Sequence, residues 1–198
     1  MNMRYPPQQK AETKARIVSA ASRMFREQGA ESNGIGSVMK EIGFTKGGFY
    51  RHFKDRDQLY VEAVEKAFSE MGDHMTGAAR GAEKGHELEA MIRLYLSKEH
   101  LNSPAVGCVL STLGSDIARQ PVAVRRQINR SMQAYRERLS QYMPGKTAEE
   151  RMATFGLLYP SMMGVLIIAR VLADPAAQEN VLANARNAFI ERYARGNS

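Results

Sequence analysis

The sequence predicts an all-α protein with a small three-helix head at the N-terminus and a larger helical body behind it. Apolar residues recur at helical spacing in segment after segment, as in amphipathic helices. No stretch shows the sustained two-residue alternation of a β-strand. Two short helical segments near the start meet across the corner Gly43-Phe44-Thr45, which is typical of a helix-turn-helix unit.

The head is expected to occupy residues 1–57. Residues 1–11 are polar and include two consecutive prolines, so we expect a loose arm there. From Thr13 the apolar positions repeat at helical spacing as far as Gly29, which predicts a first helix capped by Thr13. A short second helix is expected over residues 35–42.

The third helix is expected to begin at Thr45, whose hydroxyl would accept a hydrogen bond from a first-turn N–H group. Those N–H groups and the helix dipole would form a site for an anion such as phosphate. Gly47 and Gly48 each weaken a helix by about 1 kcal/mol relative to alanine, so they indicate positions where the backbone comes close to a partner. Phe49 and Phe53 lie four residues apart and form an inward apolar stripe.

Positive charge is concentrated in the head. The whole chain carries a net charge of +7, and residues 1–57 contribute +5 of it, because they hold eleven Lys and Arg against six Asp and Glu. A basic surface favours a polyanionic partner, and the second helix of a helix-turn-helix unit enters the major groove of DNA. The pattern indicates nucleic-acid binding, with a merely solvated basic surface as the alternative.

The body is expected over residues 58–198, with a glycine-rich break over residues 76–85 after its first helix. Further helices are expected over about residues 88–101, 108–120, 122–143, 147–172 and 175–195. The apolar run Gly156–Ala169 is shorter than the roughly 20 residues that span a bilayer, and Pro160 is expected to kink or break its helix.

The same run is apolar nearly all the way round its helix, so it needs cover on several sides. With the last helix it would form half of a four-helix bundle that a second subunit completes. The alternative is a central core helix within one chain.

Cysteine usage and the first residues bear on the compartment. Cys108 is the single cysteine, so an internal disulfide is excluded and the chain fits a reducing compartment. The N-terminal stretch lacks the apolar core of a signal peptide. We therefore expect a cytoplasmic protein and no membrane partner.

Residues 13–60 closely resemble the N-terminal domain of the TetR/AcrR family of bacterial transcriptional regulators. The resemblance is carried by Ile17, Ala20, Ala21, Phe25, Gly29, Val38, Gly43, Phe44, Thr45, Lys46, Gly47, Tyr50, His52, Phe53 and Leu59. It implies a DNA-binding head, and a fourth helix that links the head to an effector-binding and dimerisation body. It also implies a homodimeric repressor that binds double-stranded operator DNA and is released by a small-molecule or electrophile effector.

The resemblance assigns DNA contacts to the helix-turn-helix unit and the residues that follow it. The implied DNA-binding residues are Ser37, Thr45, Lys46, Gly47, Gly48, Tyr50, Arg51, His52, Lys54 and Arg56. Residues 45–48 would lie at the groove, and Arg56 would hold a backbone phosphate. Gly34 and Gly36 depart from the family pattern, which more often has a hydroxyl cap and an acidic residue there.

The body contains one motif and one set of candidate pocket residues. The stretch Gly107-Cys108-Val109-Leu110 resembles a segment found in several branches of this family, including an electrophile-responsive branch in which a cysteine here is modified. A thiol at a helix N-terminus is favoured as thiolate by the helix dipole, and the alternative is a buried core cysteine. The candidate pocket residues, each with core packing as the alternative, are Tyr95, His100, Cys108, Thr112, Met132, Tyr159, Met162 and Met163.

Two other functions compete with a regulator. A cysteine-dependent enzyme would use Cys108 as nucleophile and His100 as base, but no orienting group or oxyanion donor can be named, so no enzyme is expected. A non-specific DNA-coating protein would leave the large apolar body unexplained. His74, His86 and His100 have no metal-ligand spacing, so no metal or cofactor is expected.

Overall fold

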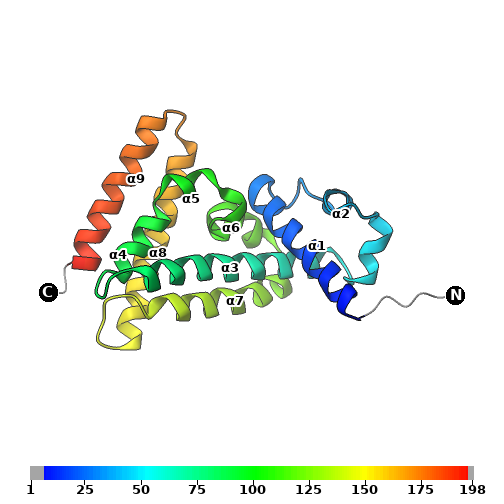
Figure 1. The fold of residues 1–198 in the computed structure, drawn as a ribbon, viewed down its shortest axis with the longest axis horizontal. Coiled ribbons are helices and arrows are strands. Elements are labelled where there is room, and N and C mark those ends of the chain that lie inside the picture. Colours follow the sequence, from blue (N-terminus) through cyan, green and yellow to red (C-terminus); the bar gives the residue numbers. More distant parts are fainter. Residues whose placement is uncertain (1–6, 196–198) are drawn as a thin grey trace.

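The computed structural model describes residues 7–195, which are helical and contain no strand (Figure 1). The α-helices are α1 (Pro7–Gln28), α2 (Ile35–Glu41), α3 (Arg56–Gly81), α4 (Glu87–Tyr95), α5 (Lys98–Asn102), α6 (Val109–Arg119), α7 (Val122–Ser140), α8 (Ala148–Val171) and α9 (Pro175–Phe189). Two short 3₁₀ helices are η1 (Lys46–Arg51) and η2 (Pro104–Val106), and a π-helical turn, η3 (Ile190–Arg195), follows α9. The all-α prediction is confirmed.

The first helix begins earlier than predicted. Helix α1 starts at Pro7, so the expected arm over residues 1–11 is wrong for residues 7–11, and residues 1–6 lie outside the described range. Proline suits the first helical position because its φ is preset and its missing N–H would have no helical acceptor there. The side chains of Gln8 and Glu12 support this turn with a hydrogen bond of 3.2 Å. Thr13 is buried inside the helix rather than capping it.

The third helix of the head is a six-residue 3₁₀ helix. Thr45 occupies its N-cap position, but the hydroxyl accepts no capping hydrogen bond, so that prediction is wrong. Two glycines and the short length disfavour an α-helix, and the 3₁₀ turn is closed instead by the backbone bond from Gly48 N to the carbonyl of Thr45 (3.0 Å). The predicted stripe is confirmed, because Phe49 and Phe53 are buried and their rings stack at 5.1 Å.

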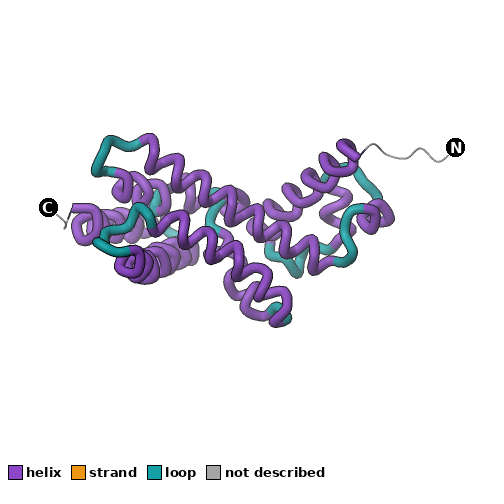
Figure 2. The backbone as a smooth tube through the Cα atoms, turned by 90° about the horizontal axis from the view of Figure 1, so that it is seen from below, coloured by secondary structure: helices purple, strands orange, loops and turns teal. Residues whose placement is uncertain are grey.

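Helix α3 runs without interruption from the head into the body. Its N-cap Asp55 accepts a hydrogen bond from Gln58 N (2.8 Å), and the helix continues to Gly81, past most of the break expected over residues 76–85. Figure 1 shows α3 and α7 side by side, and Figure 2 shows the head joined to the body through α3. Gly72 sits at the α3–α7 contact, where an added Cβ would lie 3.1 Å from the guanidinium of Arg138. The glycine therefore serves helix packing and does not end the helix.

Two of the helices expected in the body differ from the structure, one in its extent and the other in its continuity. The single helix expected over about residues 88–101 is divided into α4 and α5, because Ser97 caps α5 by accepting a hydrogen bond from the backbone N of His100 (3.1 Å). Helix α8 begins at a capping box formed by Thr147 and Glu150. Pro160 lies inside α8, which continues through it, so the expected break does not occur.

Helix α8 presents apolar side chains to solvent. Leu157, Ile168 and Val171 are 64%, 56% and 77% exposed, and they fall on one stripe of the helix. The helix is long and apolar enough to cross a membrane, and a third of that apolar stretch is buried in the protein. An exposed apolar stripe of this kind is typical of surfaces that contact another molecule.

Candidate nucleic-acid interface and body cluster

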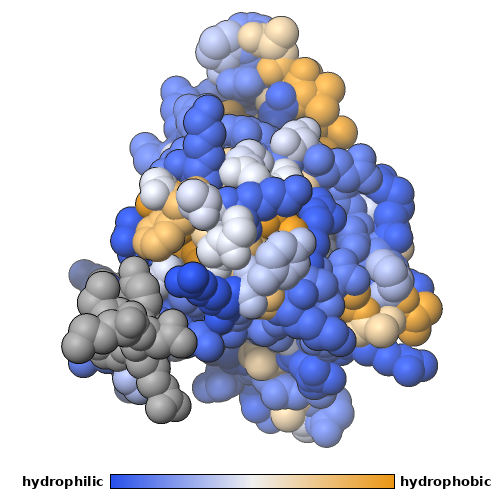
Figure 3. Space-filling model, turned by 90° about the vertical axis from the view of Figure 1, so that its right-hand side faces the viewer, coloured by the Kyte–Doolittle hydropathy of each residue, from blue (hydrophilic) through white to orange (hydrophobic). Residues whose placement is uncertain are grey.

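The predicted DNA-binding residues gather at the outer end of the head. Exposed positions in this set are Ser37, Thr45, Lys46, Gly47, Tyr50, Arg51 and Lys54, and half-buried positions are Gly48, His52 and Arg56. Figure 3 views this end of the molecule and shows a paler, partly apolar centre bordered by hydrophilic surface. The structure thus brings the predicted set together on α2, η1 and the start of α3.

The two glycines of η1 are not required by packing inside the protein. Among the residues that the structure describes, a Cβ added at Gly47 would meet no atom within 4 Å, and one at Gly48 would be in ordinary contact with Met39 Cε at 3.6 Å. Neither glycine has a positive φ. Bare backbone at an exposed position therefore leaves room for a partner outside the chain.

Two predicted contacts have further roles within the head. Arg56 donates a hydrogen bond from Nη2 to the carbonyl of Ala30 (2.6 Å), which ties the start of α3 to the loop that follows α1. Burial, together with the positive charges of Lys10 and Arg51, lowers the pKa of His52. His52 is thus neutral at pH 7 and would meet DNA as a hydrogen-bonding group rather than as a cation.

In the body, Cys108 belongs to a buried cluster with three tyrosines. Its Sγ lies 2.8 Å from the hydroxyl of Tyr159, and the Tyr159 ring lies 5.5 Å from the rings of both Tyr95 and Tyr135. Within the described range, the hydroxyls of Tyr95 and Tyr135 are buried without a hydrogen-bond partner. Burial raises the pKa of each of these tyrosines well above 10, so they stay neutral. We call Cys108, Tyr95, Tyr135 and Tyr159 the thiol cluster.

His100 does not act on the thiol. Its Nε2 accepts a hydrogen bond from the backbone N–H of Cys108 (2.9 Å), so the proton resides on Nδ1, which donates to the carbonyl of Tyr95 (2.6 Å). Burial, together with the positive charge of Arg170, lowers the pKa of His100 to about 4. Both ring nitrogens are occupied by backbone groups, and this geometry does not support a cysteine enzyme with His100 as base.

The other predicted pocket residues serve mainly local structure or the core. Thr112 donates its hydroxyl proton to the carbonyl of Val109 (3.1 Å), as threonines within helices do. Met162 is fully buried, and Met132 and Met163 pack partly buried against the core. The predicted set therefore does not form one pocket.

A cavity of about 150 Å³ lies between α3, α4 and the segment from α5 to Gly107. Its apolar wall includes Met71, Leu94 and Val106. Of the predicted pocket residues, His100 lines this cavity. A groove of about 260 Å³ lies elsewhere, between α3 and α7. Across residues 7–195, no cluster of three His, Cys, Asp or Glu side chains is arranged to hold a metal ion.

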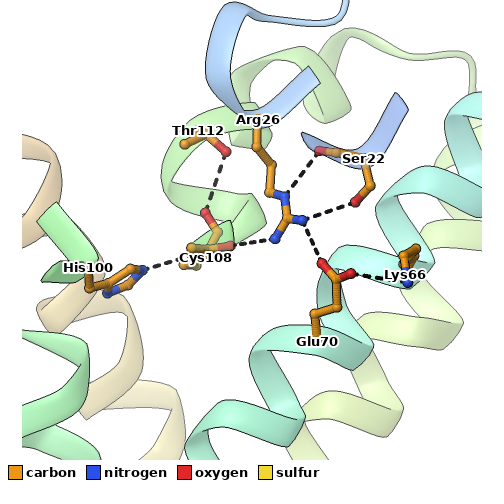
Figure 4. A network of polar contacts seen from close by, with 8 residues as sticks. Ser22, Arg26, Lys66, Glu70, His100, Cys108 and Thr112 are labelled. Carbon is orange, nitrogen blue, oxygen red and sulfur yellow. Dashed lines mark hydrogen bonds and ion pairs between the residues drawn. The ribbon is translucent and has the colours of Figure 1, made fainter. Parts of the chain in front are cut away.

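Sequence reasoning missed Arg26, whose side chain is completely buried where head and body meet (Figure 4). Its guanidinium donates to Glu70 on α3 (2.6 Å), to the carbonyl of Gly107 (3.1 Å) and to the hydroxyl of Ser22 (3.2 Å). Although burial opposes it, hydrogen bonding from Arg26 and Lys66 lowers the pKa of Glu70. Arg26 thus contacts α1, α3 and the residue before Cys108 at once. The sequence signal that could have indicated a hydrogen-bonded Arg26 is its spacing from Ser22, which lies four residues earlier on the same face of α1.

A second arginine, Arg170, is hydrogen-bonded to residues on both sides of Cys108 in the sequence. Arg170 of α8 donates to the carbonyls of His100 (3.0 Å) and Leu101 (3.2 Å) and to the hydroxyl of Ser111 (2.9 Å). The segment that carries Cys108 is therefore anchored to the head by one arginine and to α8 by another.

Comparison with known proteins shows that the head is similar to the DNA-binding domains of known regulators. Residues 17–63 match the family described as bacterial regulatory proteins, tetR family. The HTH-type transcriptional regulator AcrR of Shigella flexneri is 38% identical over 66 residues, which are 33% of this chain and 31% of that protein. The matched part thus spans about a third of the length of that curated relative.

Two further likenesses extend over the body. An uncharacterised HTH-type transcriptional regulator of Mycobacterium tuberculosis is 26% identical over 190 residues, covering 88% of this chain and 93% of that protein. The crystal structure of reduced E. coli NemR superposes with a TM-score of 0.74 at 16% identity, covering 92% of this chain and 98% of that one. The structural likeness is one of fold.

Proposed function

We propose that the chain is a homodimeric repressor of transcription of the TetR family of helix-turn-helix regulators, the family that residues 17–63 match. It binds operator DNA through the head and is released when a small molecule or an electrophile acts on the body. The observation that carries the proposal is the exposed, partly basic set on α2 and η1, backed by a glycine that packing does not require.

The DNA contact follows from this set. Lys46, Arg51 and Lys54 are exposed cations that neutralise phosphates. Tyr50 is 62% exposed and rests edge-on against the buried ring of Phe49, which holds it in place. Phosphate contacts position such a unit, and groups at the groove edge read the bases.

The dimer follows from α8. Its exposed stripe of Leu157, Ile168 and Val171 needs cover, and α9 packs against α8 on another side. A second copy that brings its own α8 and α9 would complete a four-helix bundle over residues 147–172 and 175–195. This arrangement also accounts for the apolar length of α8 in a cytoplasmic protein. Two heads would then meet successive major grooves about 34–36 Å apart.

The proposal is tested by fluorescence anisotropy with DNA from upstream of the coding region of the protein, against scrambled DNA at the same moderate salt. We expect binding to the upstream DNA to be at least about a thousandfold tighter. Equal, salt-sensitive binding to both would instead indicate a non-specific DNA-coating protein.

Cys108 is the candidate target for an electrophile. It is 1% exposed, and its sulfur is hydrogen-bonded to the hydroxyl of Tyr159. Modification of the thiol would therefore require the thiol cluster to open. Release of the DNA on treatment with N-ethylmaleimide, compared between the wild type and Cys108→Ser, decides this point. Equal release from both proteins would remove the thiol from the mechanism.

A further inference from the structure

We propose that the cavity beside His100 and Gly107 binds a small uncharged molecule with one hydrogen-bonding group, and that Arg26 transmits this binding to the head. The inference rests on the proposed function, because it identifies where an effector acts and how the head responds. The sequence pattern of the head predicts neither the existence of this cavity nor a role for Arg26.

The cavity fits a ligand of this class. Its volume of about 150 Å³ suits a molecule the size of benzene. Met71, Leu94 and Val106 supply an apolar surface, and the polar groups at its edge come from His74, Ser97 and Glu99. A charged ligand would lose hydration against this apolar wall, and the exposed carboxylate of Glu99 would offset little of that cost for a cation. A hydroxyl, by contrast, would find a hydrogen-bonding partner.

The wall of the cavity is tightly packed at Gly107, where even a methyl side chain would not fit. A Cβ added there would lie 2.7 Å from Cδ2 of His100 and 3.2 Å from the carbonyl oxygen of Ser103. The imidazole of His100 is also bonded to the backbone N–H of Cys108. A ligand that pushes on His100 therefore moves the backbone at residues 107–108.

That backbone is bonded directly to the head. The carbonyl of Gly107 accepts a hydrogen bond from Arg26, whose other donors hold Glu70 and Ser22 (Figure 4). Helix α1 also packs against η2, which ends one residue before Gly107. If the carbonyl shifts, a buried cationic donor loses its acceptor, and α1 must move to recover it.

The groove between α3 and α7 does not offer such a route. Its arginine, Arg138, is already paired with Asp73 (2.8 Å) and hydrogen-bonded to Thr76 (2.6 Å). Its lining comes from α3 and α7, and none of these residues is hydrogen-bonded to the described part of α1, whereas Gly107 of the cavity is bonded to Arg26.

The test is an NMR titration of the full chain with phenol, in the absence of DNA. Two signals are followed: the methyl group of Met71 in the cavity wall, and the Nε–H of Arg26. We expect both signals to shift and to saturate together. Absence of a saturable shift at Met71 would overturn the cavity, and a shift at Met71 without one at Arg26 would overturn the transmission.

Variants sharpen this result. Val106 is 44% exposed and lines the cavity, so Val106→Trp fills it and is expected to abolish both shifts, whereas Val122→Trp, at an exposed valine on α7, leaves them intact. Persistence of the shifts in Val106→Trp would place the phenol elsewhere and overturn the proposal.

DNA binding gives the second readout. Phenol is expected to weaken the complex with the upstream DNA by about tenfold in the wild type. The double variant R26M/E70Q removes the buried charge pair together and should lose this response while still binding phenol; retention of the response would overturn the role of Arg26. If the unliganded wild type binds no DNA, the proposed function fails, and the titration still decides the cavity.

Discussion

Arg26 Nη2 lies 2.6 Å from Glu70 Oε2, and this ion pair joins the first helix of the head to the helix that continues into the body. The Arg26 side chain is fully buried and that of Glu70 is 32% exposed. Breaking a buried pair by removing one partner leaves an uncompensated charge, which costs far more than the loss of an exposed pair.

Glu70→Gln is therefore expected to lower the free energy of unfolding by about 3 kcal/mol. The matched control is Glu62→Gln, which breaks the more exposed pair with Lys14 (2.6 Å) and should cost less than about 1 kcal/mol. Urea unfolding followed by circular dichroism measures both changes. Equal losses of unfolding free energy in the two variants would contradict the prediction that the Arg26–Glu70 pair contributes more to stability than the Lys14–Glu62 pair.

Gly47→Ala is expected to weaken binding to operator DNA by about tenfold or more without destabilising the fold. The added methyl group meets no atom of residues 7–195 within 4 Å and the φ is not positive, so the expected cost falls on the contact with DNA. Gly77→Ala in α3 is the matched control, since its Cβ is equally free of contacts. Anisotropy and thermal unfolding separate the two effects, and unchanged DNA affinity in Gly47→Ala would remove Gly47 from the interface.

Stability is expected to fall as the pH drops from about 6.5 to about 4 because of His100. Its pKa is lowered from 6.5 to about 4 in the fold. The unfolded chain therefore binds this proton more readily, so stability rises with pH across that window and is constant above it. The contribution is on the order of 3 kcal/mol. Arg170 and His74 face the ring and act in the same direction.

The check is a comparison of urea unfolding across this pH range for the wild type and His100→Gln. The variant should show a smaller loss of stability between pH 6.5 and 4, since it has no group to titrate there. Parallel pH profiles would show that His100 titrates normally.

Leu157→Glu is expected to convert the proposed dimer to a monomer and to weaken DNA binding strongly. A carboxylate placed in a buried apolar interface is costly when no cation faces it. Val122→Glu, at another exposed apolar residue that lies outside α8, should stay dimeric. Sedimentation equilibrium measures the state of both, and a dimeric Leu157→Glu would contradict the α8 interface.

Periodicity predicted most of the fold because burial follows helical spacing. Phe49 and Phe53, four residues apart, are buried and stacked as the pattern indicates. Thr45 shows the limit of local rules, because its capping role depends on an α-helix that two glycines prevent.

The body sites could not be predicted in the same way, because long-range contacts decide them. His100 and Cys108 were correctly expected in one region, but the bond between them uses the backbone N–H of Cys108 rather than its sulfur. Arg26 was missed because an arginine on a helix is normally taken as solvent-exposed. Its burial depends on the carbonyl of Gly107, 81 residues further along the chain.

The uninterrupted length of α3 gives small movements a large effect. At 26 residues the helix is about 39 Å long. A tilt of about 5° at its body end displaces its far end by roughly 3 Å, close to the rise of about 3.4 Å between successive base pairs. In this sense α3 is a lever arm, and a change too slight to disturb the core is enough to put η1 out of register with the DNA by one base pair.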